Sequence, residues 1–113
     1  IFLSNDITHL CLGDSYNSEI NLPDSLEYLQ FGNQFNKKVI LPKNLKKLIF
    51  GYKYNKSIEE FPDSLEYIYF GKKYNKQIFN IPKNLKYIKF GKEYIHHEIF
   101  TDLNNIIVDL DTM

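Results

Sequence analysis

The sequence FPDSLEYIYFGKKYN at residues 61–75 contains the pattern from which the fold of this chain can be predicted. The same phrase returns as LPDSLEYLQFGNQFN at 22–36, LPKNLKKLIFGYKYN at 41–55 and IPKNLKYIKFGKEYI at 81–95. A weaker copy, ITHLCLG, stands at 7–13. The five glycines of the chain keep the same rhythm, at intervals of 19, 19, 20 and 20 residues. A period this regular predicts a stack of similar coils rather than an ordinary globular core.

Each copy is interpreted as one coil that contains one short strand. In the copy at 22–36, Leu29 and Phe31 alternate with variable residues, which is typical of a strand. Pro23 cannot donate to a sheet ladder and therefore precedes the strand, and Gly32 follows it as the natural turn. No segment shows the roughly 10–12 residues of helical period that would indicate an α-helix. We expect coils at 2–21, 22–40, 41–60, 61–80 and 81–100, with 101–113 as a terminal partial coil.

Stacking these coils in register aligns equivalent residues into columns. Parallel strands lie ~4.8 Å apart, so each inward residue would pack on its counterpart in the next coil. The sequence predicts two aromatic columns that carry much of the stability. Their members are Phe31, Phe50, Phe70 and Phe90 in one, and Tyr16, Phe35, Tyr54, Tyr74 and Tyr94 in the other. Charges alternate between coils, for example from Asp24 to Lys43, so the same register would place opposite charges side by side.

The recurring asparagines and glycines predict features of the turns between strands. Asparagines recur at 17, 36, 55 and 75, and we expect a buried ladder whose amides satisfy the turn backbone. A ligand groove lined by asparagine is the alternative. For Gly51 and Gly71 we expect backbone conformations that a Cβ disfavours, with close packing as the alternative.

Composition limits the classes of function. The chain has 113 residues, so it is one domain at most, and its formal net charge of zero argues against nucleic-acid or membrane partners. No apolar run approaches the ~20 residues of a membrane span, and no signal peptide opens the chain. The single Cys11 suits a reducing compartment. Because residue 1 is isoleucine and the first copy is degraded, we expect the chain to be part of a longer protein.

The phrase [LIF]-P-x-[SN]-L-x-x-[LI]-x-F-G-x-x-[YF]-N resembles the FNIP (IP22) repeat, a relative of leucine-rich repeats. The tetrapeptide that names the family stands here at Phe79, Asn80, Ile81 and Pro82, and the resemblance covers about residues 2 to 100. It implies an all-β, leucine-rich-repeat-like solenoid with a parallel sheet. FNIP arrays are characteristic of slime moulds and of giant viruses of amoebae, where they often follow an F-box. The resemblance thus implies a substrate-recognition role in an F-box-type adaptor. The coils here, of 19–20 residues, are shorter than the family's usual 22.

The outward strand positions provide the candidate site. They form one column of His9, Tyr28, Lys47, Tyr67 and Tyr87, and a second of Cys11, Gln30, Ile49, Tyr69 and Lys89. Tyrosines are frequent anchors in interfaces, so we predict a partner-binding patch. Its members are Tyr28, Ile49, Tyr67, Tyr69 and Tyr87. The alternative is that tyrosine simply suits strands.

Other candidate sites are weaker. His96, His97 and Glu98 do not complete a metal site, because neighbouring residues on an extended chain point apart, and we expect no metal and no cofactor. Lys37, Lys56 and Lys76 stack with like charge, so a solvated edge is favoured over a phosphate-binding strip. No catalytic constellation is recognisable.

The sequence therefore predicts a non-enzymatic protein–protein interaction module. We expect it in the cytoplasm, which for a viral protein means the host cytoplasm or the virus particle. The alternative is a structural or self-assembling component that uses the ends or faces of the solenoid.

Overall fold

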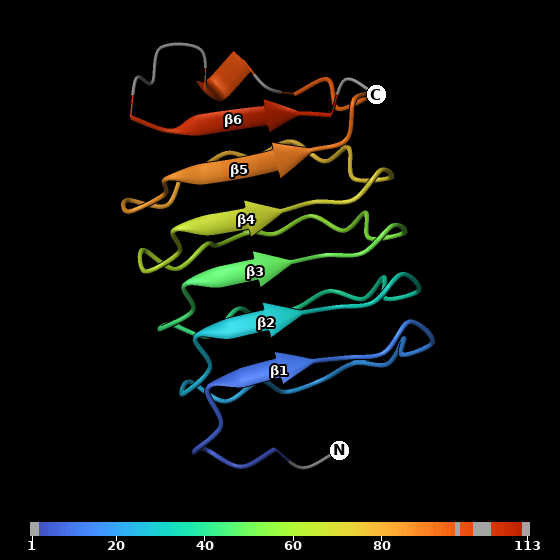
Figure 1. The fold of residues 1–113 in the computed structure, drawn as a ribbon, viewed down its shortest axis with the longest axis vertical. Helices are drawn as coiled ribbons and strands as arrows, with labels where there is room; N and C mark the ends of the chain where they lie inside the picture. The colour runs from blue at the N-terminus through green and yellow to red at the C-terminus, as the bar shows by residue number, and fades with distance from the viewer. Residues whose placement is uncertain (1–2, 97, 101–104, 112–113) are drawn as a thin grey trace.

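The computed structural model describes residues 3–96, 98–100 and 105–111. It is a parallel β-solenoid whose strands are stacked one above the other along the long axis of the molecule (Figure 1). The strands are β1 (His9–Cys11), β2 (Tyr28–Gln30), β3 (Lys47–Ile49), β4 (Tyr67–Tyr69), β5 (Tyr87–Phe90) and β6 (Ile107–Leu110). They form one sheet in sequence order, and each pairs in parallel with the next. The fold class predicted from the repeat is confirmed.

The register of the sheet matches the alignment of the repeats. Leu29 lies opposite Leu48 in the neighbouring strand, and Leu48 lies opposite Ile68. β6 was not predicted, because residues 101–113 carry no copy of the repeated phrase. It nevertheless continues the ladder, with Val108 opposite Ile88. A single 3-10 turn, η1 (Glu98–Phe100), precedes β6, and the described residues contain no α-helix.

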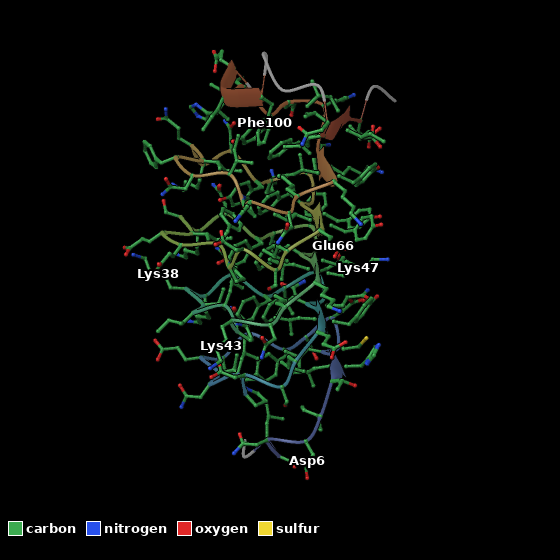
Figure 2. The ribbon with its side chains drawn as sticks, turned by 90° about the vertical axis from the view of Figure 1, so that its left-hand side faces the viewer. Asp6, Lys38, Lys43, Lys47, Glu66 and Phe100 are labelled. Carbon is green, nitrogen blue, oxygen red and sulfur yellow. The ribbon has the colours of Figure 1, made fainter. Side chains whose placement is uncertain are left out.

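The solenoid has two walls with the core between them. Figure 2 shows Lys47 and Glu66 projecting from the sheet wall, while Lys38 and Lys43 project from the opposite wall of return segments. The four complete repeats contribute inward side chains that are at most 7% exposed. Ile7, Leu10, Leu12 and Tyr16, which extend the same columns into the first coil, are only partly buried. They pack against a described coil on one side alone.

The two aromatic columns form the centre of the core. The ring centroids of Phe31 and Phe50 are 5.4 Å apart, and those of Phe50 and Phe70 are 5.5 Å apart. The second column stacks beside the first, with the rings of Phe50 and Tyr54 3.8 Å apart and nearly parallel. Phe100 ends the stack against Phe90 at a tilt of 54°. The predicted phenylalanine column is confirmed.

The asparagine ladder serves the backbone, as predicted, although it is not buried. The Oδ1 atom of Asn36 accepts a hydrogen bond from the backbone N–H of Asn55 at 2.9 Å. Asn17, Asn55 and Asn75 accept in the same way from the backbone of the following coil. All four side chains are exposed or half-buried, because the ladder follows the rim of the solenoid. The expectation of burial was therefore wrong.

The glycines differ from the prediction. Among the residues that the structure describes, no glycine has a positive φ angle. They are required by space, because a Cβ on Gly32 would lie 2.5 Å from the carbonyl oxygen of Gly13. The backbones of successive coils approach each other most closely at this point, so the alternative of close packing is correct.

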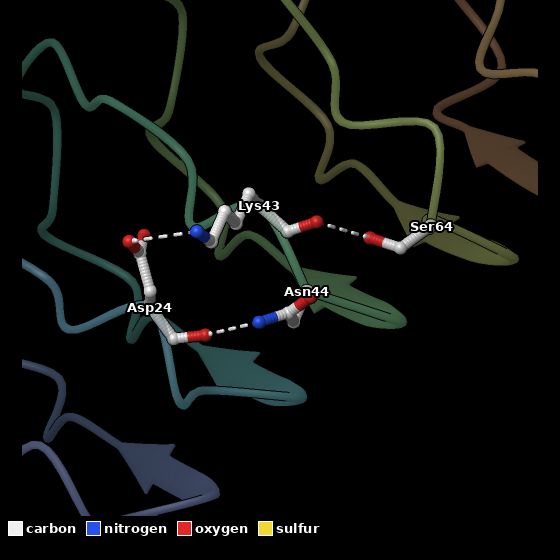
Figure 3. Close-up of polar contacts among 4 residues, drawn as sticks. All are labelled: Asp24, Lys43, Asn44 and Ser64. Carbon is white, nitrogen blue, oxygen red and sulfur yellow. Dashed lines mark hydrogen bonds and ion pairs between the residues drawn. The ribbon is translucent and has the colours of Figure 1, made fainter.

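The turns before the strands are held by polar contacts between coils, four members of which appear in Figure 3. Asn44 donates its amide to the carbonyl oxygen of Asp24 at 3.0 Å. The Ser64 hydroxyl lies within hydrogen-bond distance of two carbonyl oxygens, that of Leu45 at 2.5 Å and that of Lys43 at 3.1 Å. Lys43 Nζ lies 3.9 Å from the Asp24 carboxylate, as the alternation of charge predicted. Both groups of this ion pair are well exposed, so it contributes little to stability.

Candidate interaction surface on the sheet face

The structure brings the five predicted site residues onto one face of the sheet. Tyr28, Tyr67 and Tyr87 lie in one outward column, and Ile49 and Tyr69 lie in the neighbouring one. This arrangement follows from the local sequence, because the residue between each pair of tyrosine positions, such as Ile68 between Tyr67 and Tyr69, turns into the core. We call these five residues, with Lys47, the sheet-face patch.

Lys47 is a member of the patch that sequence reasoning did not select. Its Nζ atom lies 5.6 Å from the centroid of the Tyr28 ring and 5.4 Å from that of the Tyr69 ring. An ammonium group over two ring faces is attracted by both π systems. The lysine thus fixes the rings of two strands relative to each other. The signal in the sequence was its place in the same outward column as Tyr28 and Tyr67.

The patch continues towards β6 through a hydrogen bond. The Tyr87 hydroxyl donates to Asp109 Oδ2 at 2.5 Å, and the Tyr87 ring lies 5.2 Å from that of Tyr69. The hydrogen bond to the Asp109 carboxylate, together with burial, raises the pKa of Tyr87 to about 12. Asp109 was missed because β6 was not predicted. At the other end of the face, the His9 ring stacks on Tyr28 at 5.5 Å.

Tyr67 is the member of the patch with the greatest exposure, at 37%, while the other four predicted residues are half-buried. Among the described residues, Tyr67 has no ring contact, cation–π contact or side-chain hydrogen bond, whereas Tyr28, Tyr69 and Tyr87 have such contacts. Tyr67 is therefore the tyrosine of the patch whose side chain makes none of these contacts, while the side chains of the other three tyrosines are held by their neighbours. Such an arrangement can provide a contact surface for a partner without large loss of side-chain freedom.

The structure also describes residues of the two weaker candidate sites, the histidine segment and the lysine column. Within the described ranges, no group of three His, Cys, Asp or Glu side chains is placed to hold a metal ion. His97 lies outside the described residues, and His96 packs edge-on against Tyr94. Lys37, Lys56 and Lys76 are half-buried rather than fully solvated. The described part of the chain contains no helix with the length and apolar character needed to cross a bilayer.

A solved structure resembles this solenoid closely. CroV588, from a giant virus, is described as a novel circular LRR protein, and it aligns with a TM-score of 0.82 and 31% sequence identity. The alignment covers 96% of this chain and 18% of that chain, so the solenoid described here corresponds to less than a fifth of CroV588. A comparison with curated proteins found no match.

The family comparison agrees with the structural one. The model of the FNIP Repeat family matches residues 2–34, 33–73 and 54–93. These ranges contain the first three complete copies of the repeated phrase and all but the last two residues of the fourth. The matched residues include the glycines, all four asparagines of the ladder, and both aromatic columns apart from Tyr94. The chain belongs to the FNIP repeat family.

Proposed function

We propose that this chain is a non-enzymatic protein-interaction module whose sheet-face patch binds a protein partner. The observation that carries the proposal is the juxtaposition of four tyrosines and Ile49 in two adjacent outward columns of one rigid parallel sheet. The faces of solenoid sheets are extended surfaces that suit binding, and each outward position can vary without disturbing the core. Here the inward columns are nearly constant between coils, while the outward ones vary.

The energetics favour recognition by aromatic contact. A buried tyrosine contributes a large contact area and a hydroxyl group at a small entropic cost, so tyrosines often dominate binding energy. The rings of Tyr28 and Tyr69 are already ordered by Lys47, which reduces the entropy lost on binding. Tyr67, which lies between Lys47 and Tyr87 in its column and is exposed, is the residue we expect to contribute most.

The finer role that we propose is substrate recognition within an F-box-type adaptor. We propose a cytoplasmic location, which is the host cytoplasm or the virus particle if the protein is viral. The family resemblance supports this role. Neither nucleic acid nor a membrane surface is part of the proposal, because the formal net charge of the chain is zero.

A matched pair of tyrosine variants tests the sheet-face patch. Tyr67→Ala removes the exposed ring from the patch, while Tyr52→Ala removes a similarly exposed ring, at 42%, from a turn beyond the strand. We expect both variants to fold, as checked by circular dichroism, since neither ring is in the core. In affinity capture with the natural full-length protein, Tyr67→Ala should weaken partner recovery by about tenfold or more, which corresponds to ~1.4 kcal/mol. Equal recovery by the two variants would remove the sheet face as the binding site.

A second candidate function is self-assembly through the ends of the solenoid. Within the described sheet, β1 pairs only with β2 and β6 pairs only with β5, so each has an edge that could accept another strand. The similarity to part of CroV588, which is described as a circular LRR protein, favours a role in a larger repeat array. Light scattering across a concentration series distinguishes the two functions. A constant monomer mass with retained partner binding supports the first, and growth into longer particles supports the second.

A further inference from the structure

A cavity of about 310 Å³ lies where the chain leaves strands β4, β5 and β6. We call it the strand-exit cavity. The residues that line it include the two glycines that follow β4 and β5, three lysines and one aspartate, which are Gly71, Gly91, Lys72, Lys89, Lys92 and Asp111. Its volume is at the small end of the range of roughly 300–1,000 Å³ that holds small ligands. None of these residues belongs to the sheet-face patch, although Lys89 follows Tyr69 in the same outward column.

The cavity exists because the coils separate locally. Between the earlier coils the backbones are in close contact, as at Gly32, where a Cβ would lie 2.5 Å from the Gly13 oxygen. At Gly91 the nearest atom to such a Cβ is the Cα of Lys72 at 3.0 Å, and the Gly71 oxygen is 3.5 Å away. The last repeat therefore stands farther from its neighbour at this corner than the earlier repeats do. The wider spacing leaves room for a small ligand.

The same separation leaves backbone donors unpaired. In the three preceding junctions, a backbone N–H of one turn donates to a carbonyl oxygen of the turn before, as Lys73 does to Tyr52 at 3.1 Å. The equivalent bond, from the Glu93 N–H to the Lys72 oxygen, is not made within the described part of the chain. A N–H group beside the cavity is thus available to an external acceptor.

The residue directly after each glycine changes along the chain, and with it the side-chain acceptor for the N–H group of the next turn is lost. The side chains directly after the first two glycines, Asp14 and Asn33, accept the backbone N–H of the next turn at 3.1 and 3.2 Å. The equivalent positions in the following turns are Tyr52 and Lys72, whose side chains offer no such acceptor. The N–H groups of Lys72 and Lys92 consequently have no hydrogen-bond partner among the described residues. Of these two, the Lys92 N–H belongs to the junction with the Lys72 turn, where the cavity lies, whereas the Lys72 N–H belongs to the junction with Tyr52, which does not line it.

The three lysines add positive charge at the same place. Among the described residues, the side chains of Lys72, Lys89 and Lys92 make no ion pair, no cation–π contact and no hydrogen bond. By contrast, Lys53 donates to Gln34, and Lys73 lies over the Tyr52 ring. Asp111 offsets one of the three charges, so the lining has an excess of positive charge at neutral pH. Ammonium groups with nearby backbone N–H groups are the donors that bind phosphate oxygens.

We propose that the strand-exit cavity binds a phosphate group, either as free phosphate or on a phosphorylated side chain of a partner. A dianion with several acceptor oxygens suits a site with three lysines and unpaired N–H donors better than a carboxylate does. The site is local rather than an extended basic strip, so it fits one phosphate group and not a nucleic-acid backbone. The proposal stands on the cavity and does not require the sheet-face patch to bind a partner.

A titration of the ¹⁵N-labelled chain with sodium phosphate, compared with sodium chloride at equal ionic strength, tests the site. Saturable shifts of the amide signals of Gly91, Lys72 and Lys92 are expected in phosphate only. Lys72→Gln with Lys92→Gln should weaken this binding at least tenfold. The matched control, Lys37→Gln with Lys56→Gln, removes the same charge from two earlier coils that do not line the cavity, and it should leave the binding unchanged. Lys72→Arg with Lys92→Arg should retain it, because the charge is kept.

The proposal is overturned if phosphate and chloride give the same shifts, or if the control pair weakens binding as much as the cavity pair. A second titration, with N-acetyl-phosphoserine methylamide, identifies the source of the phosphate group. Tighter binding than inorganic phosphate supports a phosphorylated side chain, and equal or weaker binding supports free phosphate. A failure here leaves the capture experiment on Tyr67 unaffected, because Tyr67 does not line the cavity.

Discussion

The carbonyl group of Gly32 occupies the space that a side chain on Gly51 would need. A Cβ built on Gly51 would lie less than 3.0 Å from three backbone atoms of the preceding turn, two in Gly32 and one in Asn33. The same relation links Gly51 to Gly71 one coil later. Because the obstacle is backbone, it cannot move aside without shifting the whole coil.

Gly51→Ala should therefore lower the free energy of unfolding by about 1–3 kcal/mol or more, as overpacking does elsewhere. Gly13→Ala is the matched control, because nothing lies within 4 Å of its Cβ position. That variant should be neutral or stabilising by ~0.4–1 kcal/mol, since alanine reduces the entropy of the unfolded chain. Urea denaturation measures both, and equal effects at the two positions would contradict the packing explanation.

Tyr54→Phe should increase stability, by about 1 kcal/mol. The Tyr54 hydroxyl is buried and has no hydrogen-bond partner among the described residues, and an unsatisfied buried group costs ~1–3 kcal/mol. Phe35 occupies the preceding position of the same column, so the stack accepts phenylalanine.

Tyr94→Phe is the control for this substitution. The Tyr94 hydroxyl donates to the Lys76 carbonyl oxygen at 2.8 Å, so its removal should cost ~0.5–1.5 kcal/mol. Thermal unfolding of the two variants should give midpoints that move in opposite directions. A loss of stability at Tyr54 equal to that at Tyr94 would mean that the Tyr54 hydroxyl finds a partner in solution.

Asn55→Ala should destabilise the chain by ~1 kcal/mol, because it removes the Oδ1 acceptor of the Asn75 N–H, which lies 3.0 Å away. Asn55→Asp keeps an acceptor oxygen and should retain most of the stability. Asp14 already plays this role for the N–H of Asn33, at 3.1 Å. If the aspartate variant is as unstable as the alanine variant, the amide group and not the acceptor is what the ladder needs. Chemical denaturation of both variants provides the comparison.

Alkaline pH should unfold the protein through its buried tyrosines. Burial raises the pKa of Tyr54 and of Tyr74, and raises that of Tyr94 to about 12. The unfolded chain ionises these hydroxyls near pH 10, so it releases protons before the folded chain does. Stability from this source is complete below about pH 10 and falls above it, by up to ~1.4 kcal/mol per pH unit for each such tyrosine. Loss of the circular dichroism signal should accompany the rise in tyrosinate absorbance. Full ionisation of a chain that stays folded would contradict this account.

The alternation of side chains along a strand predicts some residues of the sheet-face patch and not others. Tyr28, Ile49, Tyr67, Tyr69 and Tyr87 were placed on one face from their spacing, because side chains of a strand alternate between faces. Lys47 and Asp109 were not selected, although each contacts a tyrosine of the patch. Their contacts depend on the position of the charged group at the end of each side chain relative to the neighbouring strands. The spacing of residues in the sequence does not specify that position.

The repeat period, the parallel register, the two aromatic columns and the alternating polar contacts between coils could all be predicted from the order of the amino acids alone. Each of these depends only on a residue's place within one coil, and stacking then repeats it in every coil. Tertiary structure decided that the glycines serve close packing, that the asparagine ladder lies at the rim, and that β6 extends the sheet. It also created the strand-exit cavity. These features arise from the distance between neighbouring coils, which varies along the solenoid while the repeated phrase stays nearly the same.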